Sequence, residues 1–344
     1  MLKRRDLHWL WFVGAGVLVG LYGVYWKIVH DRAIDLMGEQ IRAWNEAGYQ
    51  VSWSEMKTGG FPFDVHAEFA EPEVIAPNSA GGWRWTADSV TVGLRPWLLD
   101  RIVIKPQGRH VTSSPQYGIV DAEAENLTIA LRGGATGLRS ADIRSGYAAA
   151  VRRMDRSTLG GFSSIDVRLR QDDADPGLYS LIFEVIRPEW VEPDGGPPAE
   201  ARPDRLAARG SLSAFDVISA QRNLDERALA AWAAADGRFE LAEAMVDWTD
   251  ARLGAAGDAT IARDGEWSGA VRLEAHDLDQ VIANLAALEA IDADDARRIR
   301  QFTAMIPEGA DRPVALVLIV RDGQARLQLA PGLEVPVGNV PPAF

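Results

Sequence analysis

The most widespread pattern in this sequence is an alternation of apolar and polar residues, which recurs from about residue 60 onward. A period of two places the apolar side chains on one face of a strand and the polar side chains on the other. A run of such strands predicts an antiparallel sheet whose apolar face must be covered. The segments with this pattern contain Val65, Ala67 and Phe69; Val90, Val92 and Leu94; Leu127, Ile129 and Leu131; Ile165, Val167 and Leu169; and Leu181, Phe183 and Val185.

Strand patterns resume after a stretch rich in proline and glycine, residues 187–205. We expect single strands at 206–217 and 239–253, and further strands at 257–261 and 267–274. Near the end of the chain, two apolar segments at 314–320 and 325–329 flank the pair Asp322-Gly323. An Asp-Gly pair between alternating segments predicts a β-hairpin.

Helical periodicity occurs in four places. Residues 30–48 carry apolar side chains at spacings of three and four, and Gly48 marks the expected end of this amphipathic helix. Its apolar face could pack on the following domain or lie on a membrane surface. Helices are also expected at 223–236 and 278–291, and a fourth is expected to begin after Asp292 as its N-cap.

An apolar segment precedes these elements. Residues 7–26 contain no charged side chain apart from a protonatable histidine, and at about 1.5 Å per residue they would span about 30 Å, the hydrocarbon thickness of a bilayer. Lys3, Arg4 and Arg5 precede the segment, which places the N-terminus on the cytoplasmic side. A cleaved signal peptide is the alternative, but bulky residues stand where small ones are required. Aromatic residues lie at both ends, as at membrane interfaces: Trp9, Trp11, Tyr22, Tyr25 and Trp26.

Together these patterns predict an α+β protein that is mainly β. It would consist of a long curled antiparallel sheet with packing or capping helices, preceded by one transmembrane helix. The expected organisation is a cytoplasmic N-terminus (1–6), a transmembrane anchor (7–29), an amphipathic helix (30–48), an N-terminal β-rich part (49–186), a Pro/Gly-rich loop (187–205) and a C-terminal β/α part of the same exported domain (206–344). The bulk of the chain would then be periplasmic and held in the inner membrane by a single pass.

Charge and composition narrow the function. The formal net charge of −13 argues against nucleic acid, whose phosphates require a basic surface. The sequence has no cysteine, which excludes thiolate metal sites and cysteine nucleophiles. It contains no His-Glu-x-x-His motif, Gly-x-Ser-x-Gly elbow or Walker loop. We therefore expect no catalytic residues, no metal ligands and no cofactor.

Several short motifs carry a family resemblance. Residues 60–63, Gly-Phe-Pro-Phe, and residues 335–342, Val-Pro-Val-Gly-Asn-Val-Pro-Pro, resemble those of an uncharacterised Gram-negative envelope family, a DUF2125-like domain of unknown function. Residues 90–106 are also similar to the AsmA-like proteins. That second resemblance implies an inner-membrane anchor and a curled β-sheet groove with an apolar lining, together with a role in phospholipid movement or outer-membrane homeostasis.

The expected function is therefore non-catalytic binding of a phospholipid or another apolar envelope component in the curl of the sheet. An ordinary dry core explains the same residues equally well. The second class of function is an envelope scaffold or assembly factor that contacts another envelope protein. The candidate lining residues are Val65, Ala67, Phe69, Val90, Val92, Leu94, Leu127, Ile129 and Leu131.

Overall fold

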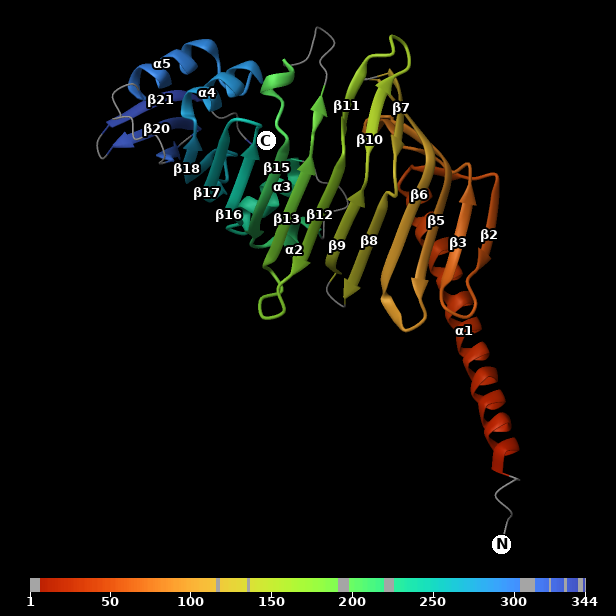
Figure 1. Cartoon of the computed structure of the whole chain (residues 1–344). Helices are drawn as coiled ribbons and strands as arrows, with labels where there is room; N and C mark the ends of the chain where they lie inside the picture. Colours follow the sequence, from red (N-terminus) through yellow and green to blue (C-terminus); the bar gives the residue numbers. More distant parts are fainter. Residues whose placement is uncertain are drawn as a thin grey trace. The chain divides into compact units, whose positions relative to one another are not determined.

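The computed structural model describes residues 7–115, 118–134, 137–190, 198–219, 226–303, 313–321, 323–330, 333–339 and 343. The chain divides into two compact units, Met1–Glu123 and Ala124–Phe344 (Figure 1). This division comes well before the Pro/Gly-rich stretch 187–205, where composition suggested a boundary. The protein is of the α+β class and mainly β, and its strands pair antiparallel.

A single helix, α1 (Leu7–Glu46), replaces the two predicted helical segments 7–29 and 30–48. It ends before Gly48, which has a φ of 90° and donates its N–H to the carbonyl of Asn45 at 3.0 Å. The predicted helix stop at this glycine is confirmed. The structure describes the side chains of α1 from Ala15 onward. Among the residues so described, no helix combines the length and apolar character needed to cross a membrane.

The first unit contains a small antiparallel sheet beside α1. Its longest strands are neighbours, and β5 pairs with β3 along its C-terminal half and with β4 along its N-terminal half. The strands predicted around residues 65–69 and 90–94 are confirmed. The strands are β1 (Gln50–Ser52), β2 (Glu55–Gly59), β3 (Val65–Ala70), β4 (Glu73–Ile75), β5 (Arg84–Arg95), β6 (Leu98–Ser114) and β7 (Gly118–Ala124).

The core of this unit lies between α1 and β3. Val29 and Ala33, one helical turn apart on α1, are buried against Val65, whose side chain is fully buried. Trp26 and Leu94 pack around the same cluster. The helix therefore covers the apolar face of β3, as a sheet with one apolar face requires.

His110 of β6 makes the stability of this unit depend on pH. Its ring is buried and stacks on Trp85 at 6.0 Å, and burial lowers its pKa below the usual 6.5, although nearby Asp88 acts in the opposite sense. The folded unit thus keeps this imidazole neutral, while the unfolded chain binds a proton below pH 6.5. The stability that His110 contributes is therefore present above pH 6.5. It is lost as the pH falls from 6.5 towards the lower pKa of His110 in the folded protein.

We expect the free energy of unfolding to fall between about pH 7.5 and about pH 5.5, and the variant His110→Phe to lose part of that dependence. Urea unfolding of both proteins at the two pH values measures it. An equal pH dependence in the two proteins would contradict this role for His110.

The strands of the second unit pair antiparallel, most of them with the next strand along the chain, although some pairings skip intervening strands. The hairpin predicted around residues 322–323 is confirmed by β19 and β20. The main strands are β8 (Thr128–Gly134), β9 (Gly137–Ser145), β12 (Ser164–Gln171), β13 (Tyr179–Ile186), β15 (Arg205–Leu212), β16 (Arg238–Asp247), β17 (Arg252–Ile261), β18 (Trp267–His276), β19 (Val314–Arg321), β20 (Gln324–Ala330) and β21 (Leu333–Asn339). Shorter strands are β10 (Ala148–Arg152), β11 (Thr158–Phe162) and β14 (Glu189–Trp190).

Short helices lie between these strands at α2 (Phe215–Ser219), α3 (Glu226–Ala234), α4 (Leu278–Ala287) and α5 (Ala293–Thr303). The helices expected within 223–236 and 278–291 are confirmed in their described parts. The predicted N-cap is confirmed too, because the Asp292 carboxylate accepts the N–H of Asp295 at 2.6 Å.

Two strand predictions are wrong. Residues 206–217 do not form one strand, because β15 ends at Leu212, Ala214 turns the chain with a φ of 53°, and Phe215 then begins α2. Residues 239–253 form a hairpin instead of one strand, with Trp248 donating its N–H to the carbonyl of Ala251 at 2.9 Å. The tip of this hairpin, Thr249-Asp250, is polar and exposed, and the buried, apolar Trp248 and Ala251 on either side of it continue the strand pattern.

Close strand approach makes Gly257 of β17 sensitive to substitution. A Cβ added there would lie 2.1 Å from the carbonyl oxygen of Ala270 on β18. We expect Gly257→Val to lower the free energy of unfolding by about 3 kcal/mol, since the neighbouring backbone must move. Gly133→Val on β8 is the control, because nothing lies within 4 Å of a Cβ at that position. Equal urea midpoints for the two variants would refute this explanation.

Candidate functional site

The strand register of the second unit gathers apolar side chains on one face. Val167 of β12 lies at the centre, opposite Ile143 of β9 on one side and Phe183 of β13 on the other. The same row continues to Ile129 on β8 and to Ala208 on β15. Because side chains alternate along each strand, the residues two positions away on each strand share this face.

We call the part of this face that runs from β8 to β15 the open strip. Its side chains are half-buried, so they contact one another without being enclosed. Val185 on the same face is buried, with 6 % of its surface exposed. The open strip consists of Ile129, Leu131, Ala141, Ile143, Ile165, Val167, Leu169, Leu181, Phe183, Leu206 and Ala208.

Helices cover the same apolar face beyond β15. Leu316 of β19 is buried under Ile282 of α4 and Ile299 of α5. Further along the strands, Ile261 of β17 is buried against Trp232 of α3. These clusters are closed cores, which makes the half-buried open strip a distinct stretch of the face.

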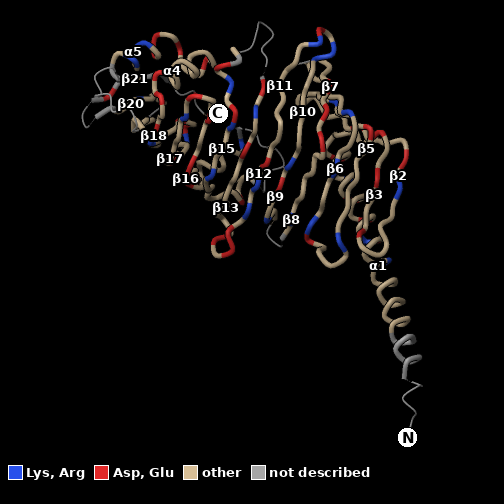
Figure 2. Tube along the Cα trace, in the orientation of Figure 1, with Lys and Arg blue, Asp and Glu red and all other residues tan. Residues whose placement is uncertain are grey.

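The opposite face of these strands is charged. Arg168 binds Asp166 at 2.5 Å, and Arg144 of β9 approaches the same carboxylate at 3.4 Å. Further across the sheet, Arg205 pairs with Glu184 at 2.7 Å. Figure 2 shows residues of both signs along the strands of this unit. The sheet thus has one hydrated, ion-paired face and one apolar face.

The ion pair between Arg168 and Asp166 makes part of the stability of this unit depend on pH. The hydrogen bond from Arg168 holds the pKa of the Asp166 carboxyl below its usual 3.8 and raises the pKa of the guanidinium. The stability from this pair is therefore present above pH 3.8 and is lost as the pH falls towards the folded pKa. Such half-exposed pairs fix the hydrated side of the sheet more than they stabilise the fold.

Comparison with known protein families gives a match. The family model of an uncharacterized protein conserved in bacteria, DUF2125, matches residues 28–341. The chain belongs to the DUF2125 family. The match begins within α1 and covers the strands of both units. Comparisons with curated proteins and with solved structures gave no significant match.

The sequence-predicted lining residues of this DUF2125 protein fall into two groups. Ile129 and Leu131 lie on the open strip, and half-buried Leu127 comes directly before β8. The others lie in the first unit, in or beside the core under α1. There Val65 and Ala67 are fully buried, Phe69 and Val90 are buried, and Val92 and Leu94 are half-buried. For the buried members, the dry-core alternative fits the structure.

Three of the predicted anchor residues of this DUF2125 protein bind α1 to the first unit. Trp9 and Trp11 lie outside the side chains that the structure describes. Tyr22, Tyr25 and Trp26 follow one face of α1, and each donates a hydrogen bond to a backbone carbonyl of the first unit: those of Pro62, Pro96 and Asp64, respectively.

Sequence reasoning missed most of the open strip. Its residues on β12 and β13, such as Val167 and Phe183, show the same alternation as the chosen residues. The pattern identified strands but did not show which strands a helix covers. Whether a helix covers a strand depends on tertiary packing, and the alternation of apolar and polar residues does not encode that packing.

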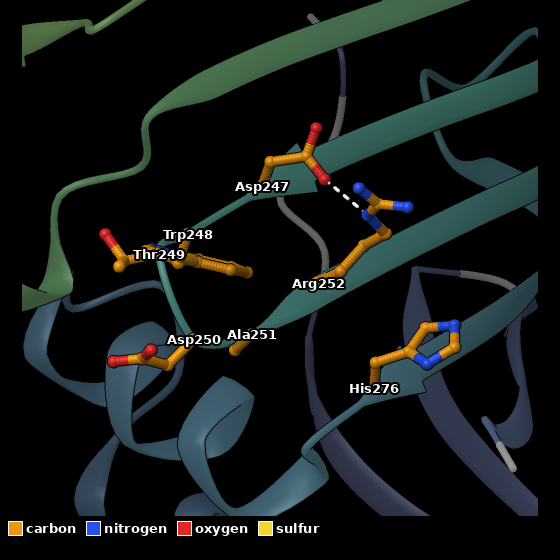
Figure 3. A pocket seen from close by; sticks show the side chains of 7 residues that line it. All are labelled: Asp247, Trp248, Thr249, Asp250, Ala251, Arg252 and His276. Atoms are coloured by element: carbon orange, nitrogen blue, oxygen red, sulfur yellow. Dashed lines mark hydrogen bonds and ion pairs between the residues drawn. The ribbon is translucent and has the colours of Figure 1, made fainter. Parts of the chain in front are cut away.

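One shallow pocket, of about 300 Å³, lies at the β16–β17 turn (Figure 3). Two of its charged groups pair with each other, since Arg252 binds Asp247 at 2.5 Å, and His276 lies on the neighbouring strand. The buried Trp248 donates its indole N–H to the carbonyl of Ala201. The pocket is thus a surface depression beside a hairpin turn. No catalytic site is evident in the part of the chain that the structure describes. Nor does that part hold a group of three or more acidic or histidine side chains suited to a metal ion.

Proposed function

We propose that this DUF2125 protein is a membrane-anchored, non-catalytic lipid-binding protein. Its open strip would hold an acyl chain of a phospholipid, or a similar apolar envelope component, against the sheet. The observation that carries the proposal is the half-buried apolar face from β8 to β15, beside stretches of the same face that helices cover.

The dimensions of the open strip suit an acyl chain. The five neighbouring strands β8, β9, β12, β13 and β15 are spaced by about 4.8 Å, so the strip extends about 19 Å across them. Half the hydrocarbon thickness of a bilayer, about 15 Å, is the length of one acyl chain in a membrane. One chain lying across the strands would therefore remain on apolar side chains throughout.

Burial supplies the driving force. Each square ångström of apolar surface removed from water contributes about 25 cal/mol, and the strip residues keep part of their surface exposed. The opposite face offers no comparable surface, because its charged groups pair with one another. An apolar ligand would thus bind one side of the sheet only.

Membrane attachment is the second part of the proposal. Residues 7–26 form a nearly uncharged apolar stretch, and Lys3, Arg4 and Arg5 precede it. The excess of basic residues favours a cytoplasmic N-terminus, which would put both units on the periplasmic side of the inner membrane. The resemblance to AsmA-like proteins implies the same arrangement.

Native mass spectrometry of the full chain, purified from bacterial membranes and released from detergent in the gas phase, tests the binding. We expect one phospholipid per chain that persists after extensive exchange into delipidating detergent. A lipid-free protein that keeps its thermal stability would refute lipid binding and would favour the scaffold, in which a partner protein covers the strip.

A further inference from the structure

Two loops of the first unit carry exposed apolar side chains next to α1. Residues 60–64 join β2 to β3, and residues 96–97 join β5 to β6. Phe61 and Phe63 of the first loop expose 55 % and 73 % of their surfaces. Trp97 of the second loop and Leu99 at the start of β6 expose 54 % and 55 %. We call these four residues the apolar collar.

The helix fixes both loops. Tyr25 donates its hydroxyl to the carbonyl of Pro96 at 2.6 Å, and Trp26 donates its indole N–H to the carbonyl of Asp64 at 2.8 Å. The hydroxyl of Tyr22 binds the carbonyl of Pro62. The loops are therefore held at one level of the helix, on the face that carries these three aromatic residues.

The first loop is shaped to expose its aromatic rings. The amides of Phe63 and Asp64 both donate to the carbonyl of Gly60, at 3.0 and 2.9 Å. Gly60 has a φ of 109°, and a Cβ there would lie 2.2 Å from the Asp64 carboxylate, so only glycine fits. The rings of Phe61 and Trp26 meet edge to face with their centroids 5.4 Å apart, while Phe63 leaves most of its surface exposed.

The outer face of α1 is apolar at the same level. Leu21, Val24 and Ile28 follow one another at spacings of three and four, and each exposes more than 60 % of its surface. Between Ala15 and Trp26 the helix has no charged residue, and the first charge is Lys27, which pairs with Asp31 at 2.9 Å. Figure 1 shows the N-terminal part of α1 extending beyond the strands of the first unit.

We propose that the apolar collar docks the first unit on a lipid bilayer, with the collar residues inserted at the interface around α1. The collar is continuous with the exposed apolar surface of the helix, and large aromatic residues of this kind are enriched at the membrane–water boundary. Lys27 and Asp31 then mark the level at which water begins. The inference rests on the membrane attachment proposed above and adds a second contact, which would hold the unit close to the bilayer instead of on a free tether.

The chain has no cysteine, so single-cysteine variants report one position each. The full-length variants Phe63→Cys, Trp97→Cys, Val19→Cys and Ile119→Cys would each carry a fluorophore after reconstitution into phosphatidylcholine vesicles. Lipids bearing a nitroxide near the headgroup or deep in the acyl chain act as quenchers. Ile119 of β7, with 43 % of its surface exposed, is the control, because it pairs with Ser113 at the far end of β6 from Leu99.

We expect shallow nitroxides to reduce the emission at positions 63 and 97 by about half, with less quenching by deep nitroxides and none at position 119. Quenching at position 19 without quenching at 63 and 97 would refute the collar while leaving the anchor intact. Absence of quenching at positions 19, 63 and 97 would refute both. Unchanged melting temperatures of the labelled variants show that the fold is retained.

Discussion

Val167→Glu is expected to abolish co-purification of lipid with this protein. Val167 lies at the centre of the open strip, between Ile143 and Phe183. A carboxylate at this place would lose hydration whenever an acyl chain covered it, which costs about 3 kcal/mol. This corresponds to about a hundredfold weaker binding. Quantitative lipid analysis of the purified variant measures the effect.

The matched control is Arg170→Gln. Arg170 lies on the same strand but on the exposed, charged face, and its replacement changes the net charge by the same single unit. We expect the control to retain lipid at the wild-type level. Equal lipid content in both variants, with both folded, would show that the open strip is not the binding surface.

Val65→Asp is expected to prevent the first unit from folding. The side chain is fully buried against Val29 and Ala33 of α1. A carboxylate placed there would be unpaired, with a cost of about 4 kcal/mol or more, which approaches the whole stability of a small unit. Limited proteolysis should then cleave within residues 49–115, which the wild-type protein protects.

Thr91→Asp provides the control for that change. Thr91 lies on β5, on the opposite face, where it pairs with Glu68 and Lys105. We expect this variant to resist proteolysis like the wild-type protein. A folded, protease-resistant Val65→Asp protein would mean that the helix does not seal this face, and the groove interpretation of Val65 would regain support.

The sequence predicted the fold class and most strands because alternation is a local signal. The strand with Val65, Ala67 and Phe69 and the hairpin near residue 322 depend only on neighbours in the chain. The turn after Trp248 escaped prediction because only two polar residues, Thr249 and Asp250, separate the buried Trp248 from the buried Ala251. The single helix α1 escaped for a related reason: no helix-breaking residue separates the apolar segment from the amphipathic one.

The candidate site was predictable only in part. Alternation placed Ile129 and Leu131 correctly on an apolar face, yet it treated Val65 as equivalent to them. The difference comes from α1, which packs on β3 from a distant part of the chain. The Gly-Phe-Pro-Phe motif is a weak sequence signal of the apolar collar. The sequence does not show that hydrogen bonds from Tyr22 and Trp26 hold this loop against α1.

Photo-crosslinking tests the central claim most directly. A photoreactive phenylalanine analogue would replace Val167 or, as the control, Arg170 in the full chain within bacterial membranes. After irradiation, we expect a phospholipid adduct on the protein with the analogue at position 167 and none at position 170. Adducts at neither position, or equally at both, would contradict the binding of lipid on the open strip.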